Sequence, residues 1–192
     1  PDFWDLHAKD MESWKQEGRT YYRLKGPMCQ QFFVNEFVYQ ESGHPLHAIV
    51  REQTGRTALL ETIKDYSHQK NNVWGVTARN HEQNFALNVL MDPDVDFVTL
   101  LGTAGTGKTL LALAAGLAQT MDVQRYREII MTRATVSVGE DIGFLPGTEE
   151  EKMTPWMGAL TDNLEVLADP QEGGSWGRAA TNDLLASRIK IR

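Results

Sequence analysis

The feature that most constrains this chain is residues 97–118, which read FVTLLGTAGTGKTLLALAAGLA. The stretch begins with an apolar run at residues 97–101, as expected of a parallel strand buried on both faces. Residues 102–109 then match the pattern G-x-x-x-x-G-K-[ST] at every position. Residues 110–119 are rich in Leu and Ala, which is typical of a buried helix. Strand, glycine loop and helix in this order predict a phosphate-binding loop.

The residue types of this loop suit a nucleotide. Glycines let the backbone N–H groups approach a phosphate closely, and the loop runs into a helix N-terminus, which favours anions. Lys108 is expected to reach the β- and γ-phosphates and Thr109 to ligate Mg²⁺, which makes these two the candidate catalytic residues. The structural alternative is a glycine-rich connection between strand and helix that binds no ligand. The residues expected to hold the nucleotide here are Gly102, Thr103, Ala104, Gly105, Thr106, Gly107, Lys108, Thr109 and Leu110.

Residues 128–132 (EIIMT) form the next predicted strand. A strand–helix–strand unit implies a right-handed crossover and hence a parallel sheet flanked by helices, so the fold class predicted is α/β. Arg133 follows this strand directly, and the carboxyl ends of parallel strands face the ligand crevice. Arg133 is therefore a candidate phosphate or nucleic-acid contact, with a surface ion pair as the alternative. Further on, a helix is expected from Thr154 and Pro155, and residues 188–192 alternate as a strand does.

A helix is also predicted before the loop, at residues 80–90. Asn80 is a suitable N-cap for it. Gln83 can then serve as the capping-box partner at the third helical position. Alternatively, its amide can pair with the amino group and N7 of adenine.

Residues 1–75 differ from the rest of the chain in residue pattern, because short strand-like runs alternate with turn signals. We expect a small β-rich segment there. Its aromatic residues either fill a core or stack on bases. Glu41, His44 and His47 have a spacing that a metal could use, although a solvated loop explains them as well. The domain boundary is expected near Trp74, with domains at 1–75 and 76–192. The aromatic residues considered are Tyr21, Tyr22, Phe32, Phe33, Phe37 and Tyr39.

Composition narrows the choice of partners and compartment. The net charge of -7 argues against a surface that is basic all over, so any nucleic-acid contact must be a local patch. One cysteine cannot form an internal disulfide, which favours a reducing cytoplasm. No apolar run approaches the roughly 18 residues of a membrane span. The start at Pro1 without a Met suggests an excised or processed piece.

One element of a working P-loop NTPase is missing from the sequence. An apolar strand that ends in Asp is needed to help hold Mg²⁺, and none follows Thr109. Glu140 and Asp141 follow a glycine rather than such a strand. The chain is thus expected either to be truncated before this carboxylate or to bind nucleotide without hydrolysis.

The loop together with residues 129–164, IIMTRATVSVGEDIGFLPGTEEEKMTPWMGALTDNL, closely resembles the PhoH family of P-loop ATPases. The likeness covers residues 77–192. The sequence RNHEQ is similar to the adenine-reading motif of superfamily 1 helicases, which favours the base-reading role for Gln83. The tail WGRAATNDLLASRIKIR looks like that of longer PhoH-like proteins that carry a PIN ribonuclease domain ahead of the ATPase.

The resemblance implies a RecA-like fold, ATP and Mg²⁺ as cofactors, single-stranded RNA as a partner and a ring-shaped homo-oligomer. It also implies a PIN domain in the same full-length chain and places the missing carboxylate beyond Arg192. The expected function is an ATPase that couples hydrolysis to RNA binding or unwinding, with the piece itself inactive. Two alternatives stay open: a P-loop kinase of small molecules, and a nucleotide-binding module that does not hydrolyse.

Overall fold

The computed structural model describes residues 11–41, 43–132 and 188–191. The chain divides into two compact units, one ending at Asp65 and the other starting at Tyr66. The predicted domain boundary near Trp74 stays a prediction.

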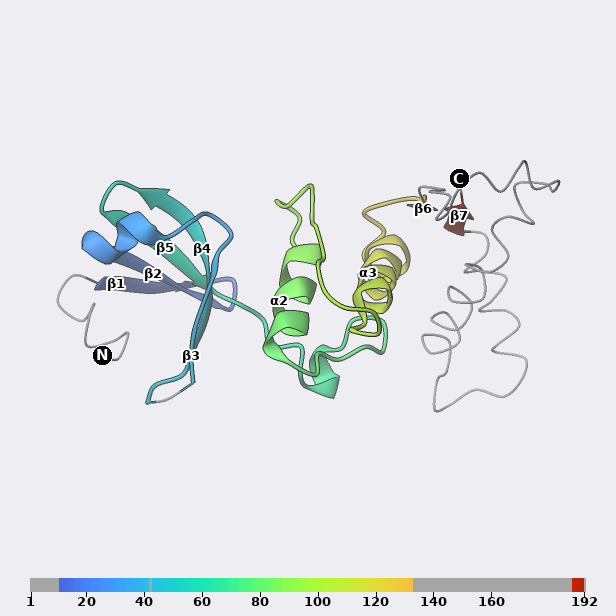
Figure 1. Cartoon of the computed structure of the whole chain (residues 1–192), viewed down its shortest axis with the longest axis horizontal. Helices are drawn as coiled ribbons and strands as arrows, with labels where there is room; N and C mark the ends of the chain where they lie inside the picture. The colour runs from blue at the N-terminus through green and yellow to red at the C-terminus, as the bar shows by residue number, and fades with distance from the viewer. Residues whose placement is uncertain (1–10, 42, 133–187, 192) are drawn as a thin grey trace, which may run out of the picture. The chain divides into compact units, whose positions relative to one another are not determined.

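The N-terminal unit is an antiparallel sheet of five strands with the order β1-β2-β5-β4-β3 (Figure 1). Two of its connections are two-residue hairpin turns. In the first, Glu17 and Gly18 both have positive φ, as a type I′ turn requires. In the second, the positive φ falls on Gly55. The strands are β1 (Met11–Gln16), β2 (Arg19–Lys25), β3 (Phe37–Gln40), β4 (Leu46–Thr54) and β5 (Thr57–Thr62).

One face of this sheet carries the core of the unit. A short 3-10 helix, η1 (Pro27–Gln31), contributes the buried Cys29 to it. Tyr22 and Phe32 pack against this core, so the core alternative is correct for these two aromatic residues. The buried core residues are Leu24, Cys29, Leu46, Ala48, Val50, Ala58 and Leu60.

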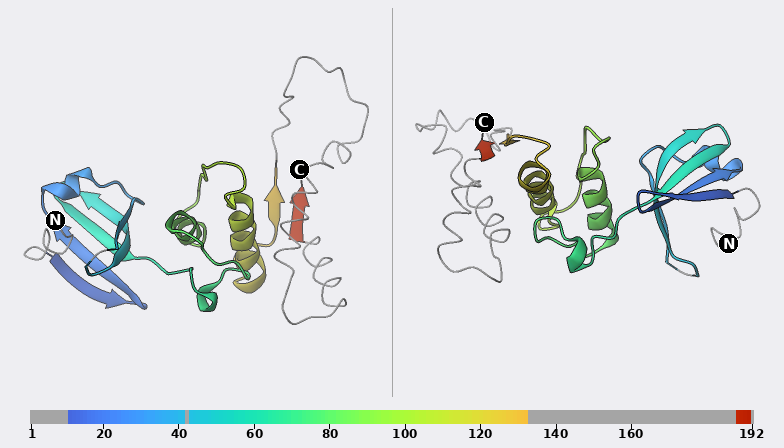
Figure 2. Two further views of the ribbon diagram at one scale, coloured as in Figure 1. Left: turned by 60° about the horizontal axis from the view of Figure 1, so that its bottom comes forward. Right: turned by 180° about the vertical axis from the view of Figure 1, so that it is seen from behind.

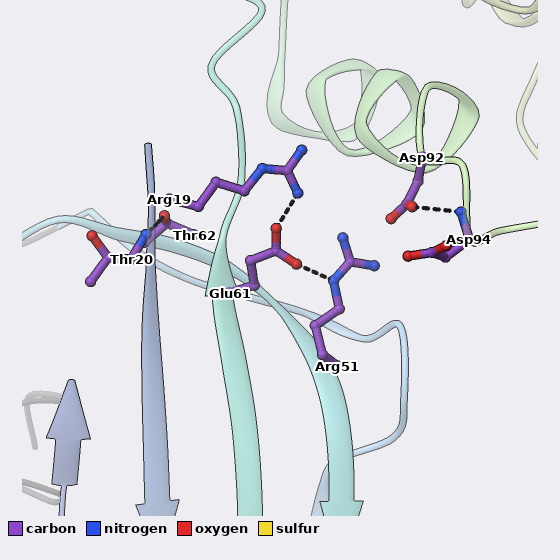
Figure 3. A network of polar contacts seen from close by, with 7 residues as sticks. All are labelled: Arg19, Thr20, Arg51, Glu61, Thr62, Asp92 and Asp94. Atoms are coloured by element: carbon purple, nitrogen blue, oxygen red, sulfur yellow. Dashed lines mark hydrogen bonds and ion pairs between the residues drawn. The ribbon is translucent and has the colours of Figure 1, made fainter. Parts of the chain in front are cut away.

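The other face of the sheet holds a buried carboxylate. Glu61 is 4% exposed and accepts hydrogen bonds from Nη1 of Arg19 and Nε of Arg51 (Figure 3). The backbone N–H of Thr20 donates to the Thr62 hydroxyl beside it, at 2.9 Å. Three adjacent strands are thereby tied together by side chains as well as by the backbone ladder.

One predicted strand in this unit is shorter than expected. The apolar run 31–40 is broken by a turn, in which Asn35 has a φ of 69° and the Glu36 N–H donates to the Phe33 carbonyl at 3.0 Å. Only Phe37–Gln40 pairs as β3. Asn tolerates the left-handed conformation better than other non-glycine residues, and that tendency outweighs the apolar pattern here.

The second unit is built around two helices, α2 (His81–Leu90) and α3 (Lys108–Leu117). Asn80 caps α2 as predicted, since its Oδ1 accepts from the Gln83 N–H at 2.9 Å. A short 3-10 helix, η2 (Gln69–Asn71), precedes α2, and one π-helical turn, η3 (Ala118–Asp122), continues α3. The core of the two helices consists of Tyr66, Val73, Ala78, Leu87, Leu111, Ala114, Ala115 and Ala118.

Two further strands, β6 (Ile129–Met131) and β7 (Ile189–Ile191), lie side by side and run parallel (Figure 2). Both fall where strands were predicted, and Lys190 of β7 forms an ion pair with Glu128 next to β6. These two are the parallel strands among the described residues. The wider RecA-like sheet stays a prediction.

The strand predicted for residues 97–101 is wrong for this structure. The segment has no assigned strand, and Phe97 and Leu101 are 85% and 91% exposed. A strand buried on both faces needs neighbours that pair with it and layers that cover it. Within the described residues β6 and β7 pair with each other instead.

Across all the described residues of the chain, no helix combines the length and the apolar composition that crossing a membrane requires.

Candidate nucleotide-binding site

The glycine loop leads directly into helix α3. Gly107 is the N-cap of the helix and has a φ of 85°, and Gly105 has a φ of 79°. Residues with a Cβ rarely adopt these angles, so glycine is required at both positions. The Leu111 N–H donates to the Gly107 carbonyl at 2.9 Å, which is the first hydrogen bond of the helix. The N–H groups at the start of α3 have no helical acceptor and are directed toward the loop.

Lys108 folds back over the loop that precedes it. Its Nζ donates to the carbonyl oxygens of Gly102 at 2.9 Å and Thr103 at 2.7 Å. It also reaches the Thr106 hydroxyl at 3.2 Å, and that hydroxyl donates to the Thr103 carbonyl at 2.9 Å. The ammonium group therefore lies within the ring of backbone that the motif defines.

The close approach around Gly102 explains why this position carries no side chain. A Cβ built there would lie 3.2 Å from the Thr106 hydroxyl oxygen and 3.9 Å from Lys108 Nζ. A larger residue would crowd the lysine that is expected to hold phosphate. The loop residues 102–106 are exposed, as is Thr109 in the first turn of α3. A phosphate chain can thus reach the N–H groups, the ammonium and the Thr109 hydroxyl from solvent.

Gln83 joins the capped end of α2 to this loop. Its Oε1 accepts from the Arg79 N–H at 2.8 Å, which resembles the capping-box contact one residue earlier in the chain. Its Nε2 donates to the Thr106 carbonyl at 3.2 Å. A Cβ on Gly107 would come within 3.4 Å of this Nε2 atom. The structure therefore brings together the two regions, 80–83 and 102–110, that the sequence predicted to form one site.

Two buried polar residues that the sequence analysis did not single out hold this arrangement. Asn84 is 5% exposed, and its Oδ1 accepts from the Tyr66 N–H at 2.8 Å. Gln119 is 8% exposed, and its Nε2 donates to the Leu90 carbonyl at the end of α2, at 3.0 Å. The sequence feature that could have indicated these two residues is an amide side chain on the apolar face of each predicted helix. The sequence does not identify their hydrogen-bond partners, because each partner is a backbone group far away in sequence.

The other predicted site residues lie outside the described residues or in the N-terminal unit. Arg133, the 138–147 loop and the helix expected from Thr154 lie outside the described residues. Glu41 and His44 are exposed, and His47 stands in β4 with its ring 6.4 Å from that of Tyr39. In residues 11–41, 43–132 and 188–191, no group of three His, Cys, Asp or Glu could hold a metal ion.

A protein-family model matches a region of this chain that includes the glycine loop. The family model described as PhoH-like protein matches residues 75–183. Protein PhoH2 of Bacillus subtilis (strain 168) is 44% identical over 146 residues, which make up 74% of this chain and 32% of the relative.

Two further matches cover shorter parts of this chain. Protein PhoH2 of Mycolicibacterium smegmatis is 46% identical over 99 residues, covering 51% of this chain and 23% of the relative. The PhoH-like protein of Synechocystis sp. is 34% identical over 97 residues, covering 50% and 29%. The chain thus spans about a third or less of the length of these relatives. No solved structure matches it significantly.

Proposed function

The chain belongs to the PhoH family, and from this premise we propose that residues 102–110 bind the phosphates of Mg-ATP for hydrolysis in the intact protein. The observation that carries the proposal is the position of Lys108. Its ammonium lies 2.7–2.9 Å from two loop carbonyls at the start of α3, where incoming phosphate oxygens would attract it more strongly than neutral carbonyls do. The loop N–H groups would add donors to the same phosphates.

Each residue then has a defined part. Lys108 would neutralise charge on the β- and γ-phosphates, and the Thr109 hydroxyl would help to hold Mg²⁺. Mg²⁺ supplies charge neutralisation and orientation of the γ-phosphate. Gln83 selects adenine through its amide. Arg133 is proposed to contact phosphate or RNA.

The base-reading role of Gln83 has a structural consequence. Both ends of its amide already bond to backbone groups, at Arg79 and Thr106. Pairing with adenine therefore requires the amide to exchange at least one of these bonds for the base. We propose that reading the base and adjusting the loop at Thr106 are one event.

This proposal predicts nucleotide selectivity that depends on Gln83. The parent chain should bind ATP more tightly than GTP, by roughly five-fold or more for a bidentate amide–adenine pair. Gln83→Ala should bind the two nucleotides about equally. Fluorescent ATP competed by unlabelled ATP or GTP provides the measurement, and Asn88→Ala in the same helix is a control. Equal affinities in the parent would remove Gln83 from the site without touching Lys108.

In the intact protein, we propose that hydrolysis is coupled to single-stranded RNA, in a ring-shaped homo-oligomer in the cytoplasm, with a PIN ribonuclease domain in the same chain. Phosphate release by an intact-length relative should rise when single-stranded RNA is added. Turnover that is the same with and without RNA would contradict the coupling. The absence of any turnover would favour a nucleotide-binding module.

A further inference from the structure

The outer face of the β1–β2 hairpin carries a group of side chains that the nucleotide site does not use. Trp14 and Tyr21 face each other across the two strands, with ring centroids 5.6 Å apart and planes inclined by 10°. The guanidinium of Arg23 lies 5.2 Å from the centre of the Trp14 ring. All three side chains are partly or largely exposed. We call Trp14, Tyr21 and Arg23 the hairpin stack.

The hairpin stack is not part of the core. The core of this unit lies on the opposite face of the sheet, where Met11 and Tyr22 of the same two strands pack against it. Trp14 and Tyr21 alternate with these residues and therefore point the other way. Flat, stacked rings at an accessible sheet surface are the platform on which bases of single strands stack.

The charges on this face are those a phosphate backbone requires. Arg19, Arg23 and Lys25 alternate with Tyr21 along β2 and share its face, and Arg51 joins Arg19 at the Glu61 carboxylate. Against these four cations stand three carboxylates of the described strands: Glu12, which pairs with Arg23, Glu52, which lies opposite Leu59 on this face, and Glu61, which two arginines share. These described residues of the face thus carry one net positive charge, although the chain as a whole has a net charge of -7. Arg19 and Arg23 lie on either side of Tyr21 along β2, and Lys25 lies one strand repeat beyond Arg23.

We propose that the outer face of the β1–β2 hairpin binds single-stranded nucleic acid. Bases stack against Trp14 and Tyr21, while Arg23 and Lys25, which follow Tyr21 along β2, contact the phosphates on that side of the rings. Among the described strands β1 lies at the edge of the sheet, so a strand of nucleic acid can lie beside it without displacing another described strand (Figure 1). A duplex is excluded by this chemistry because its bases are stacked on one another. The site does not depend on nucleotide at Lys108.

The test measures binding of labelled oligonucleotides of about twelve residues, a length within the range that small β-domains cover. Oligo(U), oligo(dT) and a duplex of equal length are titrated with the full chain by fluorescence anisotropy. Trp14→Ala should weaken binding of the single strands by about five-fold or more, the lower end of what one stacked base contributes. Trp14→Phe keeps a stacking ring and should retain most of the affinity.

Charge is tested with a matched pair of variants. Arg23→Ala should lower the slope of log affinity against log salt by about 0.7, as expected for one lost phosphate contact on a single strand. Lys15→Ala removes the same charge from the opposite face of β1 and should change the slope little. Thermal unfolding of each variant checks that the sheet is intact.

The outcomes are distinct. Binding of either single strand that falls with Trp14→Ala and Arg23→Ala supports the proposal, and a preference for oligo(U) would identify RNA. Equal binding of the duplex, unchanged affinity in a folded Trp14→Ala, or no binding by the parent at about 50 mM salt would overturn it. If the parent binds no oligonucleotide, the partner of this face of the hairpin would be a protein instead. Lys108→Ala should bind oligonucleotides like the parent, so failure at the P-loop and failure at the hairpin can be told apart.

Discussion

At the scale of single residues, Glu61 shows how a buried charge is kept in the N-terminal unit. The carboxylate is 4% exposed, and one guanidinium contacts each of its two oxygens. The hydrogen bond with Glu61 raises the pKa of Arg19 above its ordinary value, which means that the contact favours the charged guanidinium. Among the described residues, no buried side-chain polar atom lacks a hydrogen-bond partner.

Replacing Glu61 by Gln should therefore destabilise the unit. The neutral amide leaves two arginines close together without their shared counter-charge. We expect the free energy of unfolding to fall by about 1–3 kcal/mol, a range lowered because both arginines are partly exposed. Urea unfolding followed by circular dichroism measures the change. Glu52→Gln on β4 is the control, since Glu52 is exposed; equal losses in both variants would contradict the account.

The sequence alone could not predict this triad. Glu61 stands out as a charge within the apolar run TALLETI, but its partners lie 42 and 10 residues away. The same limit applies to Asn84 and Gln119. By contrast, the Asn80 cap was predictable, because its partner Gln83 lies three residues on.

At the scale of elements, helix α3 packs against β6 through Gly116. A Cβ on Gly116 would lie 3.1 Å from Cδ1 of Ile129, closer than most such contacts. A glycine inside a helix costs up to about 1 kcal/mol relative to Ala. The close approach of β6 to α3, which the glycine permits, compensates for this cost in helix propensity.

Gly116→Val should separate these elements. The branched side chain overpacks the contact with Ile129, and we expect a loss of about 1–3 kcal/mol in stability. Ala112→Val provides the comparison, because Ala112 is an exposed position of the same helix and loses only helix propensity, up to about 0.7 kcal/mol. Thermal melts of the two variants decide the question. A Gly116→Val protein as stable as Ala112→Val would show that the contact is not close.

Elements set by local sequence were predicted well, and elements set by partners were not. Both described helices and the strands 129–131 and 189–191 fall where periodicity and caps placed them. Residues 97–101 have an ideal strand composition but no described strand beside them. The turn at Asn35 interrupts another apolar run. A strand is stabilised by neighbours distant in sequence, which composition does not identify.

At the scale of the whole molecule, the chain combines a β unit and a P-loop unit of the PhoH family. The motif 102–109 alone was sufficient to predict a loop that leads into a helix, and the structure adds that Gln83 contacts it. The match covers about a third or less of these relatives, so turnover and RNA coupling are properties to be measured on intact proteins. Nucleotide binding can be measured on this chain itself.

The most direct test of the account is calorimetric titration of Mg-ATP into the parent chain and into Lys108→Ala. Lys108 supplies the ammonium in the loop, and its loss should weaken Mg-ATP binding by at least about ten-fold, as expected for a charged contact to phosphate. Lys70 is an exposed lysine of the same unit, in η2, and Lys70→Ala should bind Mg-ATP like the parent. Saturable binding lost only in Lys108→Ala is the predicted result. Equal affinity in all three proteins would contradict the assignment of this loop as the nucleotide site.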